Sequence, residues 1–204
     1  MLLGHAYMFT IDNFQNHAGN KPMKNTLNKL GVCVALCFIF LGGCSPKTEL
    51  EQAVENATAG NVNAQYNLGM MYRYGEGVPQ DYAEAMKWLR LAADQGVAEA
   101  QHRIGQMHHN GEGVPQDYAE AVKWYRLAAD QGFAVPRLNL AVMYYNGLGV
   151  PQDYVEAYAW SSVAAAGGID VDYRDSIVGE LTPEQLAEGQ KRATELLEKI
   201  SSGK

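Results

Sequence analysis

An eleven-residue stretch, GEGVPQDYAEA, begins at Gly75, is repeated unchanged from Gly111, and returns with two substitutions from Gly147, so the period is 36 residues. Self-similarity at a period of about 20–50 residues is typical of proteins built by stacking one supersecondary unit on the next. A unit of this size cannot bury its apolar face alone, so each copy must pack on its neighbours. The repeat therefore predicts a solenoid.

Each unit contains the pattern of a helical hairpin. Apolar residues at helical spacing predict a first helix over about residues 64–74 and a second over about residues 82–95. Between them, Gly75 can end the first helix in a left-handed conformation, and Pro79 disfavours helix at the residue before it. Asp81 is predicted to cap the second helix by accepting a hydrogen bond from a free N–H group, worth about 1 kcal/mol.

A small residue recurs inside the first helix of every unit. Gly69 and Gly105 occupy this position in the first two units, and Ala141 occupies it in the third. Glycine inside a helix costs about 1 kcal/mol relative to alanine. Its presence there predicts that a neighbouring helix passes close to this point.

Both ends of the repeat array are predicted to carry cap helices, since a terminal unit has one face without a neighbour. An N-terminal cap helix is expected within residues 49–62. Thr182 and Gln185 form a predicted capping box that opens a C-terminal helix. The expected packing face of that helix is Leu186, Ala193, Leu197 and Ile200, and its expected surface ion pairs are Glu188 with Arg192 and Glu195 with Lys199.

The unit pattern, A-x-A-Q-Y-N-L-G-x-M-Y followed by G-x-G-V-P-Q-D-Y-x-x-A-x-x-W and A-A-x-x-G, resembles the Sel1-like repeat family, a relative of the tetratricopeptide repeats. The resemblance covers residues 63–98, 99–134 and 135–170. It implies an all-α fold, a right-handed α-solenoid of stacked antiparallel helix pairs, with C-terminal cap helices within residues 171–204. Some cysteine-rich members have been assigned β-lactamase activity, but these repeats contain no cysteine.

The N-terminal region contains a predicted export signal. Residues 23–43 join a short basic segment to an apolar run shorter than the ~20 residues that a membrane-spanning helix needs, which is typical of a secretory signal peptide. The sequence Leu-Gly-Gly-Cys ending at Cys44 resembles a bacterial lipobox and implies lipid attachment at Cys44, followed by a tether over residues 44–48. Because Ser45 follows, the resemblance implies an outer membrane lipoprotein facing the periplasm. Residues 1–22 fit no pattern, and we expect them to be an upstream misreading of the gene or disordered.

Charge and candidate chemistry argue against several functions. The chain has 23 acidic and 16 basic residues, with a formal charge of −7, which disfavours nucleic acid and anionic lipid as partners. Membrane contact is therefore expected through the N-terminal lipid only. The carboxylates Asp81 and Glu84 recur in every unit, which suits helix capping better than one active site. His102, His108 and His109 lack the spacing of metal ligands. We predict no catalytic residue, no metal and no cofactor.

The near-identical units differ chiefly in their first helices, which in relatives of this fold line a concave groove. The mixture of aromatic, amide and arginine side chains at the varying positions suits a protein or peptide partner. The leading hypothesis is a non-enzymatic protein-protein interaction adaptor, lipid-anchored in the bacterial cell envelope, with the partner in this groove. The alternative is an envelope enzyme or cell-wall binder, either β-lactamase-like or peptidoglycan-recognising. The predicted groove residues are Tyr66, Asn67, Met70, Arg73, Tyr74, His102, Arg103, Gln106, His109, Asn110, Leu138, Asn139, Val142, Tyr145 and Asn146.

Overall fold

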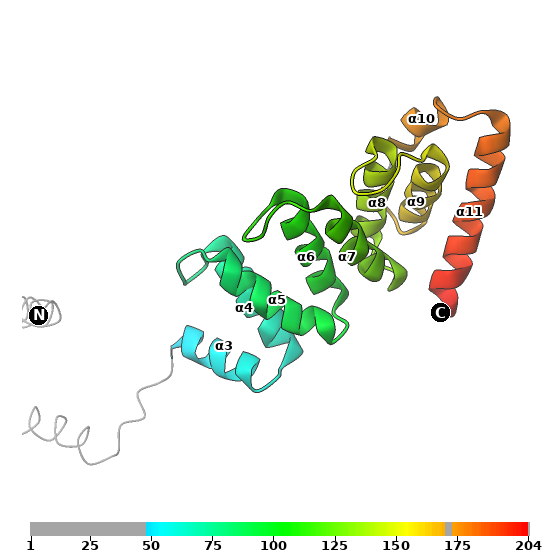
Figure 1. Ribbon diagram of the computed structural model, residues 1–204. Helices are drawn as coiled ribbons and strands as arrows, with labels where there is room; N and C mark the ends of the chain where they lie inside the picture. Colours follow the sequence, from blue (N-terminus) through cyan, green and yellow to red (C-terminus); the bar gives the residue numbers. More distant parts are fainter. Residues whose placement is uncertain (1–47, 170–172, 204) are drawn as a thin grey trace, which may run out of the picture. The chain divides into compact units, whose positions relative to one another are not determined.

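The computed structural model describes residues 48–169 and 173–203, which belong to one compact unit of the chain (Figure 1). These residues form helices and no strand, so the prediction of an all-α fold is confirmed. None of their helices is both long enough and apolar enough to cross a membrane. Cys44, the predicted signal segment 23–43 and residues 1–22 lie outside the described residues. The helices are α3 (Glu49–Thr58), α4 (Val62–Tyr74), α5 (Tyr82–Asp94), α6 (Ala98–Asn110), α7 (Tyr118–Asp130), α8 (Ala134–Asn146), α9 (Tyr154–Ala166), α10 (Tyr173–Val178) and α11 (Pro183–Ser202).

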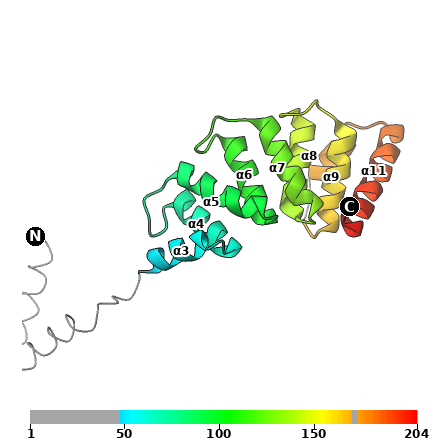
Figure 2. The same ribbon diagram turned by 60° about the horizontal axis from the view of Figure 1, so that its bottom comes forward.

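The helices pair in the order of the chain. Within each repeat the first helix packs against the second, which gives the hairpins α4–α5, α6–α7 and α8–α9. Each second helix then packs against the first helix of the next repeat, so the hairpins stand side by side (Figure 2). Helix α3 covers α4 at one end, and α10 and α11 pack against α9 at the other. The predicted solenoid of stacked helix pairs is therefore present.

The repeated loop ends one helix and starts the next, as its sequence predicts. Gly75 and Gly77 both have φ of +73°, a left-handed conformation that costs glycine little. The Asp81 side chain then accepts hydrogen bonds from the Ala83 and Glu84 N–H groups, at 2.9 and 3.0 Å. Asp117 and Asp153 make equivalent caps at the starts of α7 and α9. Capping thus accounts for the repeated aspartate, as predicted.

The small residue inside each first helix marks a close helix contact. A Cβ atom added to Gly69 would lie 2.7 Å from Leu89 Cγ, and one added to Gly105 would lie 2.6 Å from two ring carbons of Tyr125. Both neighbours belong to the second helix of the same hairpin. The glycine therefore allows the two helices of a hairpin to approach each other more closely than a side chain would permit.

The hydrophobic core runs along the stack in three segments. Trp88 and Leu68 belong to the segment against α3, and Leu89 and Ile104 belong to the segment between the first two hairpins. The third segment includes Trp160 of α9 and reaches Leu196 of α11. Each segment is built from neighbouring elements, which is the arrangement expected of a solenoid.

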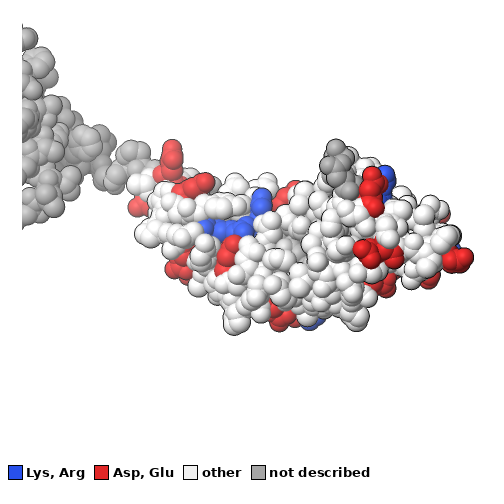
Figure 3. Space-filling model, turned by 90° about the horizontal axis from the view of Figure 1, so that it is seen from above, with Lys and Arg blue, Asp and Glu red and all other residues white. Residues whose placement is uncertain are grey.

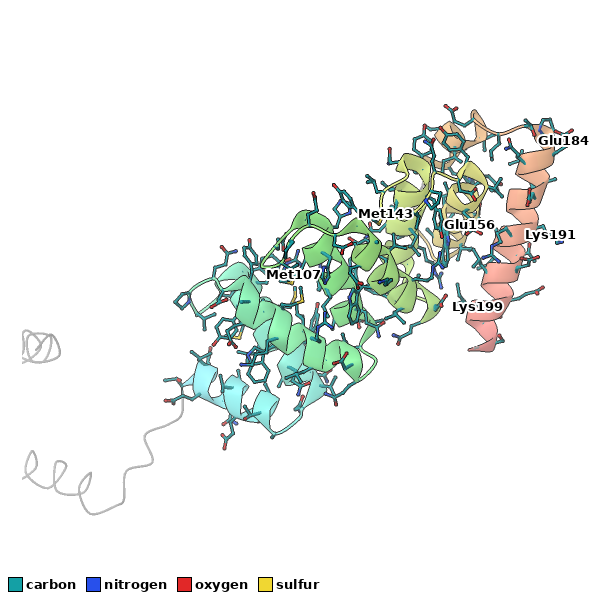
Figure 4. All side chains as sticks on the ribbon, viewed as in Figure 1. Met107, Met143, Glu156, Glu184, Lys191 and Lys199 are labelled. Carbon is teal, nitrogen blue, oxygen red and sulfur yellow. The ribbon has the colours of Figure 1, made fainter. Side chains whose placement is uncertain are left out.

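The C-terminal helix α11 packs on the core through Ala193 and Ile200 as predicted, but it differs from the prediction at Leu197 and in its ion pairs. Leu196 is 3% exposed and packs on the core, whereas Leu197 is 37% exposed. Arg192 forms ion pairs with Glu156 of α9 at 2.6 Å and with Glu195 at 3.3 Å, and Lys199 forms one with Asp130 of α7 at 2.7 Å. Glu156 and Lys199 are labelled in Figure 4. The expected pairs Glu188–Arg192 and Glu195–Lys199 are therefore wrong, because carboxylates of the neighbouring hairpins offer these cations partners across the helix interface.

A candidate binding face on the first helices

The predicted groove residues all lie on α4, α6 and α8, but they differ widely in exposure. Asn67, Tyr74, Asn110 and Asn146 are exposed, and most of the others are half-buried. Arg73 and His102 are buried, at 6% and 4% exposure. We use the name first-helix face for the fifteen predicted residues together. Whether they bind a partner stays a prediction.

One pocket brings five of these residues together. Gln106, His109 and Asn110 of α6 line it on one side, and Asn139 and Val142 of α8 line it on the other. Its volume is about 240 Å³. Two further lining residues, Tyr125 and Met143, are nearly fully buried parts of the core. Variation between repeats does not identify these two residues as pocket residues. Their positions fit the core pattern of the helices, and the sequence does not show that they border a gap between two hairpins.

Arg73, one of the predicted groove residues, is buried and held by the following repeat. Its Nε donates to Glu112 Oε2 at 2.8 Å, and its Nη1 donates to Gln106 Oε1 at 3.1 Å. Arg103 Nη1 donates to the same Gln106 oxygen at 3.0 Å. Burial would raise the pKa of Glu112, but hydrogen bonds from Arg73 and Asn110 outweigh it and hold that pKa below its usual value. The salt bridge therefore joins the first two hairpins with Glu112 in its charged form.

His102 is the second residue that the structure places inside the stack. Its ring lies 5.8 Å from the rings of both Tyr125 and Phe133, measured between centroids. Burial first, and then the charges of Arg103 and Arg73, lower the pKa of His102 to about 4. The imidazole is consequently neutral near pH 7, and its Nε2 can accept a hydrogen bond from the Asn139 amide, 3.1 Å away. His102 thus links α6 to α8 and does not line an open surface.

Aromatic side chains close the C-terminal end of the face. The Tyr145 ring lies 5.2 Å from the ring of Tyr154 and 5.2 Å from that of Tyr173, which belongs to α10. Burial, the leading cause, raises the pKa of Tyr173 to about 12. The sequence pattern did not indicate this contact, because Tyr173 lies beyond the third repeat.

The side of the molecule seen in Figure 3 has a basic cluster toward its N-terminal half, with an acidic group beside it. Further acidic groups and a smaller basic group are scattered over the C-terminal half of the same view. Among the described residues, no three His, Cys, Asp or Glu side chains are grouped closely enough to hold a metal ion. What the face offers chemically is a set of amides, aromatic rings and arginines suited to hydrogen bonding and stacking.

A row of helical hairpins, each packed on the next, defines a helical repeat scaffold. The Sel1 repeat matches residues 62–97, 98–133 and 137–169, and the chain belongs to the Sel1 repeat family. The first two matched segments begin one residue before the repeats that the sequence pattern predicts. Proteins of this family are generally non-enzymatic protein-interaction adaptors.

Two solved structures share the fold. A Sel1 repeat protein from Oxalobacter formigenes is 36% identical, with a TM-score of 0.56, over 65% of this chain and 98% of that one. A protective antigen of uropathogenic Escherichia coli strains that displays an SLR fold is 26% identical, with a TM-score of 0.56, over 84% of this chain and 45% of the antigen. The chain therefore spans less than half of the antigen. No curated protein sequence matches the chain.

Proposed function

We propose that this protein is a lipid-anchored adaptor of the bacterial cell envelope that binds an extended segment of a partner protein along its first-helix face. The contrast between the two helices of each repeat carries the proposal. Residues 82–95 and 118–131 differ at only two positions, whereas the five predicted groove positions all carry different side chains in the first two repeats. The nearly constant second helices of these two repeats preserve the stack, and the varied first helices can make a different contact in each repeat.

The chemistry of the face supports an extended partner. Asn67, Asn110 and Asn146 are exposed, and Asn139 lines the pocket between α6 and α8. A side-chain amide both donates and accepts, so it can bond the N–H and C=O groups of an extended main chain. The pocket, about 240 Å³ in volume, is large enough for one partner side chain.

Photo-crosslinking in cells tests the binding face. A photoreactive phenylalanine analogue would replace Asn67, Asn110 or Asn146, each exposed on a first helix. Matched control positions are Lys87 and Lys123, exposed on second helices. We expect discrete crosslinked bands from the first-helix positions only. Equal bands from both sets, or none from the first helices, would contradict the proposal.

The envelope location is tested separately. Cys44→Ser removes the proposed lipid attachment site while leaving residues 48–203 unchanged. We expect the wild-type protein in the outer membrane fraction and the variant in the soluble periplasmic fraction. Incorporation of labelled palmitate into the wild type and not into the variant is the direct readout. Equal labelling of both proteins would rule out Cys44 as the site.

A further inference from the structure

Arg103 is a cation without an ionic partner on the first-helix face. Its Nη1 donates to Gln106 Oε1 at 3.0 Å, but its Nε is buried and has no hydrogen-bond partner among the described residues. No carboxylate of the described residues forms an ion pair with it, whereas Arg73 has Glu112 at 2.8 Å. A buried guanidinium N–H without an acceptor costs free energy, so the protein itself does not fully satisfy the hydrogen-bonding groups of Arg103.

The surroundings of Arg103 leave a net positive charge on this part of the face. Glu112 is already occupied, since it accepts from Arg73 and from the Asn110 amide at 2.8 Å. Burial is the main cause that lowers the pKa of His102, and the positive charges of Arg103 and Arg73 lower it further. The residues that line the pocket on α6 and α8 include the amides Gln106 and Asn139 and no carboxylate.

Arg103 lies in the middle repeat, beside the pocket between α6 and α8. Gln106, which accepts from Arg103, lines the pocket between α6 and α8. The positions equivalent to Arg103 in the first and third repeats are Asn67 and Asn139. A partner segment that follows the first helices would therefore meet amides on either side and one cation between them. Because Arg103 lies in the middle repeat, we expect the partner segment to contact it through a side chain and not through the end of its chain.

We propose that the first-helix face selects a partner segment carrying an aspartate or glutamate, whose carboxylate bonds the Arg103 guanidinium while an adjoining residue of the segment enters the pocket. Arg–carboxylate pairs can form two parallel hydrogen bonds. The Arg103 side chain is only half-buried, so part of it stays open to a ligand. The chain has a formal net charge of −7 and therefore repels an acidic segment over most of its surface. A local cation gives such a segment one favoured position, which is a source of specificity. This inference rests on the proposed function, because it names the chemistry of that same face.

The test uses the full-length protein and an array of random nonapeptides, acetylated and amidated at their ends, with Glu, Gln, Asp or Asn fixed at the centre. We expect the acidic peptides to bind about tenfold more tightly than their amide counterparts, the effect of one charge-assisted hydrogen bond worth about 1.4 kcal/mol. Arg103→Gln should abolish this preference by lowering the affinity for the acidic peptides to that for their amide counterparts. Arg126→Gln, an exposed arginine on the second helix of the same repeat, should keep it.

The outcomes separate the inference from the proposed function. Equal binding of acidic and amide peptides by the wild type, or an unchanged acidic preference in Arg103→Gln, overturns the carboxylate site while leaving the binding face intact. A second array of the same peptides without C-terminal amidation is the control for chain ends, and binding in that array alone overturns the side-chain assignment. Binding to none of the peptides, together with no crosslink from the first helices, contradicts the proposed function itself. In an added set of peptides with Lys or Arg at the centre, Arg103→Glu should bind these basic peptides in preference to the acidic ones. A melting curve of each variant reports that it folds.

Discussion

At the scale of single residues, His102 makes the stability of the protein depend on pH. The pKa of this histidine is about 4 in the folded protein and 6.5 in an unfolded chain. The unfolded state therefore binds a proton more readily between these values, and the free energy of unfolding falls as the pH drops from 6.5 toward 4. A difference of this size corresponds to roughly 3 kcal/mol.

Replacing His102 with leucine, the residue at the equivalent position 138, should flatten this dependence. Urea unfolding of wild type and His102→Leu between pH 4.5 and 7.5 measures it. We expect the wild type to lose stability faster on acidification, with a smaller slope remaining in the variant because burial also lowers the pKa of His108. Parallel curves for the two proteins would show that His102 does not carry the effect.

Gly105 sets the separation between α6 and α7. Gly105→Ala should destabilise the protein by about 1–3 kcal/mol, because the new Cβ would meet the Tyr125 ring, whereas alanine alone would favour the helix by about 1 kcal/mol. The same substitution in a Tyr125→Ala background is the control, since the ring is then absent. We expect Gly105→Ala to be neutral or stabilising there, as measured by chemical denaturation. An equal loss in both backgrounds would contradict the close contact.

At the scale of elements, the register of α11 on α9 can be tested by comparing substitutions of two neighbouring leucines, Leu196 and Leu197. Leu196 is 3% exposed and packs on the core, and Leu197 beside it is 37% exposed. Leu196→Ala should cost about 2–4 kcal/mol, and Leu197→Ala less than about 1 kcal/mol. Thermal or urea unfolding of the two variants distinguishes them. If Leu197→Ala cost more than Leu196→Ala, Leu197 would be the buried residue, as the sequence pattern predicts.

The hairpins could be predicted because their determinants are local. Gly75 and Asp81 act within a few residues of their own positions, and the helical spacing of apolar residues repeats three times. The partners of Arg73 and Arg192 could not be predicted, because Glu112 and Glu156 lie 39 and 36 residues away. Variation between repeats located the first-helix face, but it does not distinguish a position that varies to bind a ligand from one that varies to join two hairpins.

At the scale of the whole molecule, the described residues form a stack whose neighbours along the chain are also neighbours in space. Among these residues, substantial contacts join each hairpin to the next, and α11 to α9. Stability in such a stack is approximately a sum of repeat terms and interface terms. A deletion that respects the period should therefore shorten the stack without destroying it.

Deleting residues 75–110 makes this prediction specific. The new junction joins Tyr74 to Gly111, and the loop that follows is identical in sequence to the one removed. Helix α4 then pairs with α7. In this new hairpin Gly69 leaves room for the Tyr125 ring, as Gly105 does in the intact protein. Gln131, which bonds Gln101 at 2.8 Å, would find Gln65 in its place, as Gln95 does at 2.7 Å in the intact chain.

We expect the shortened protein to keep its helical content per residue and to melt in one cooperative transition, at a lower temperature because one interface and the Arg73–Gln106 bond are lost. Circular dichroism against temperature is the measurement. The control is deletion of residues 75–92, half a period, which removes most of α5 and leaves α4 without its antiparallel partner. That protein should lose most of its helicity and expose apolar surface to a hydrophobic dye. If both deletions behaved alike, the helices would not be packed as 36-residue units, and the first-helix face would have no defined order of side chains to present.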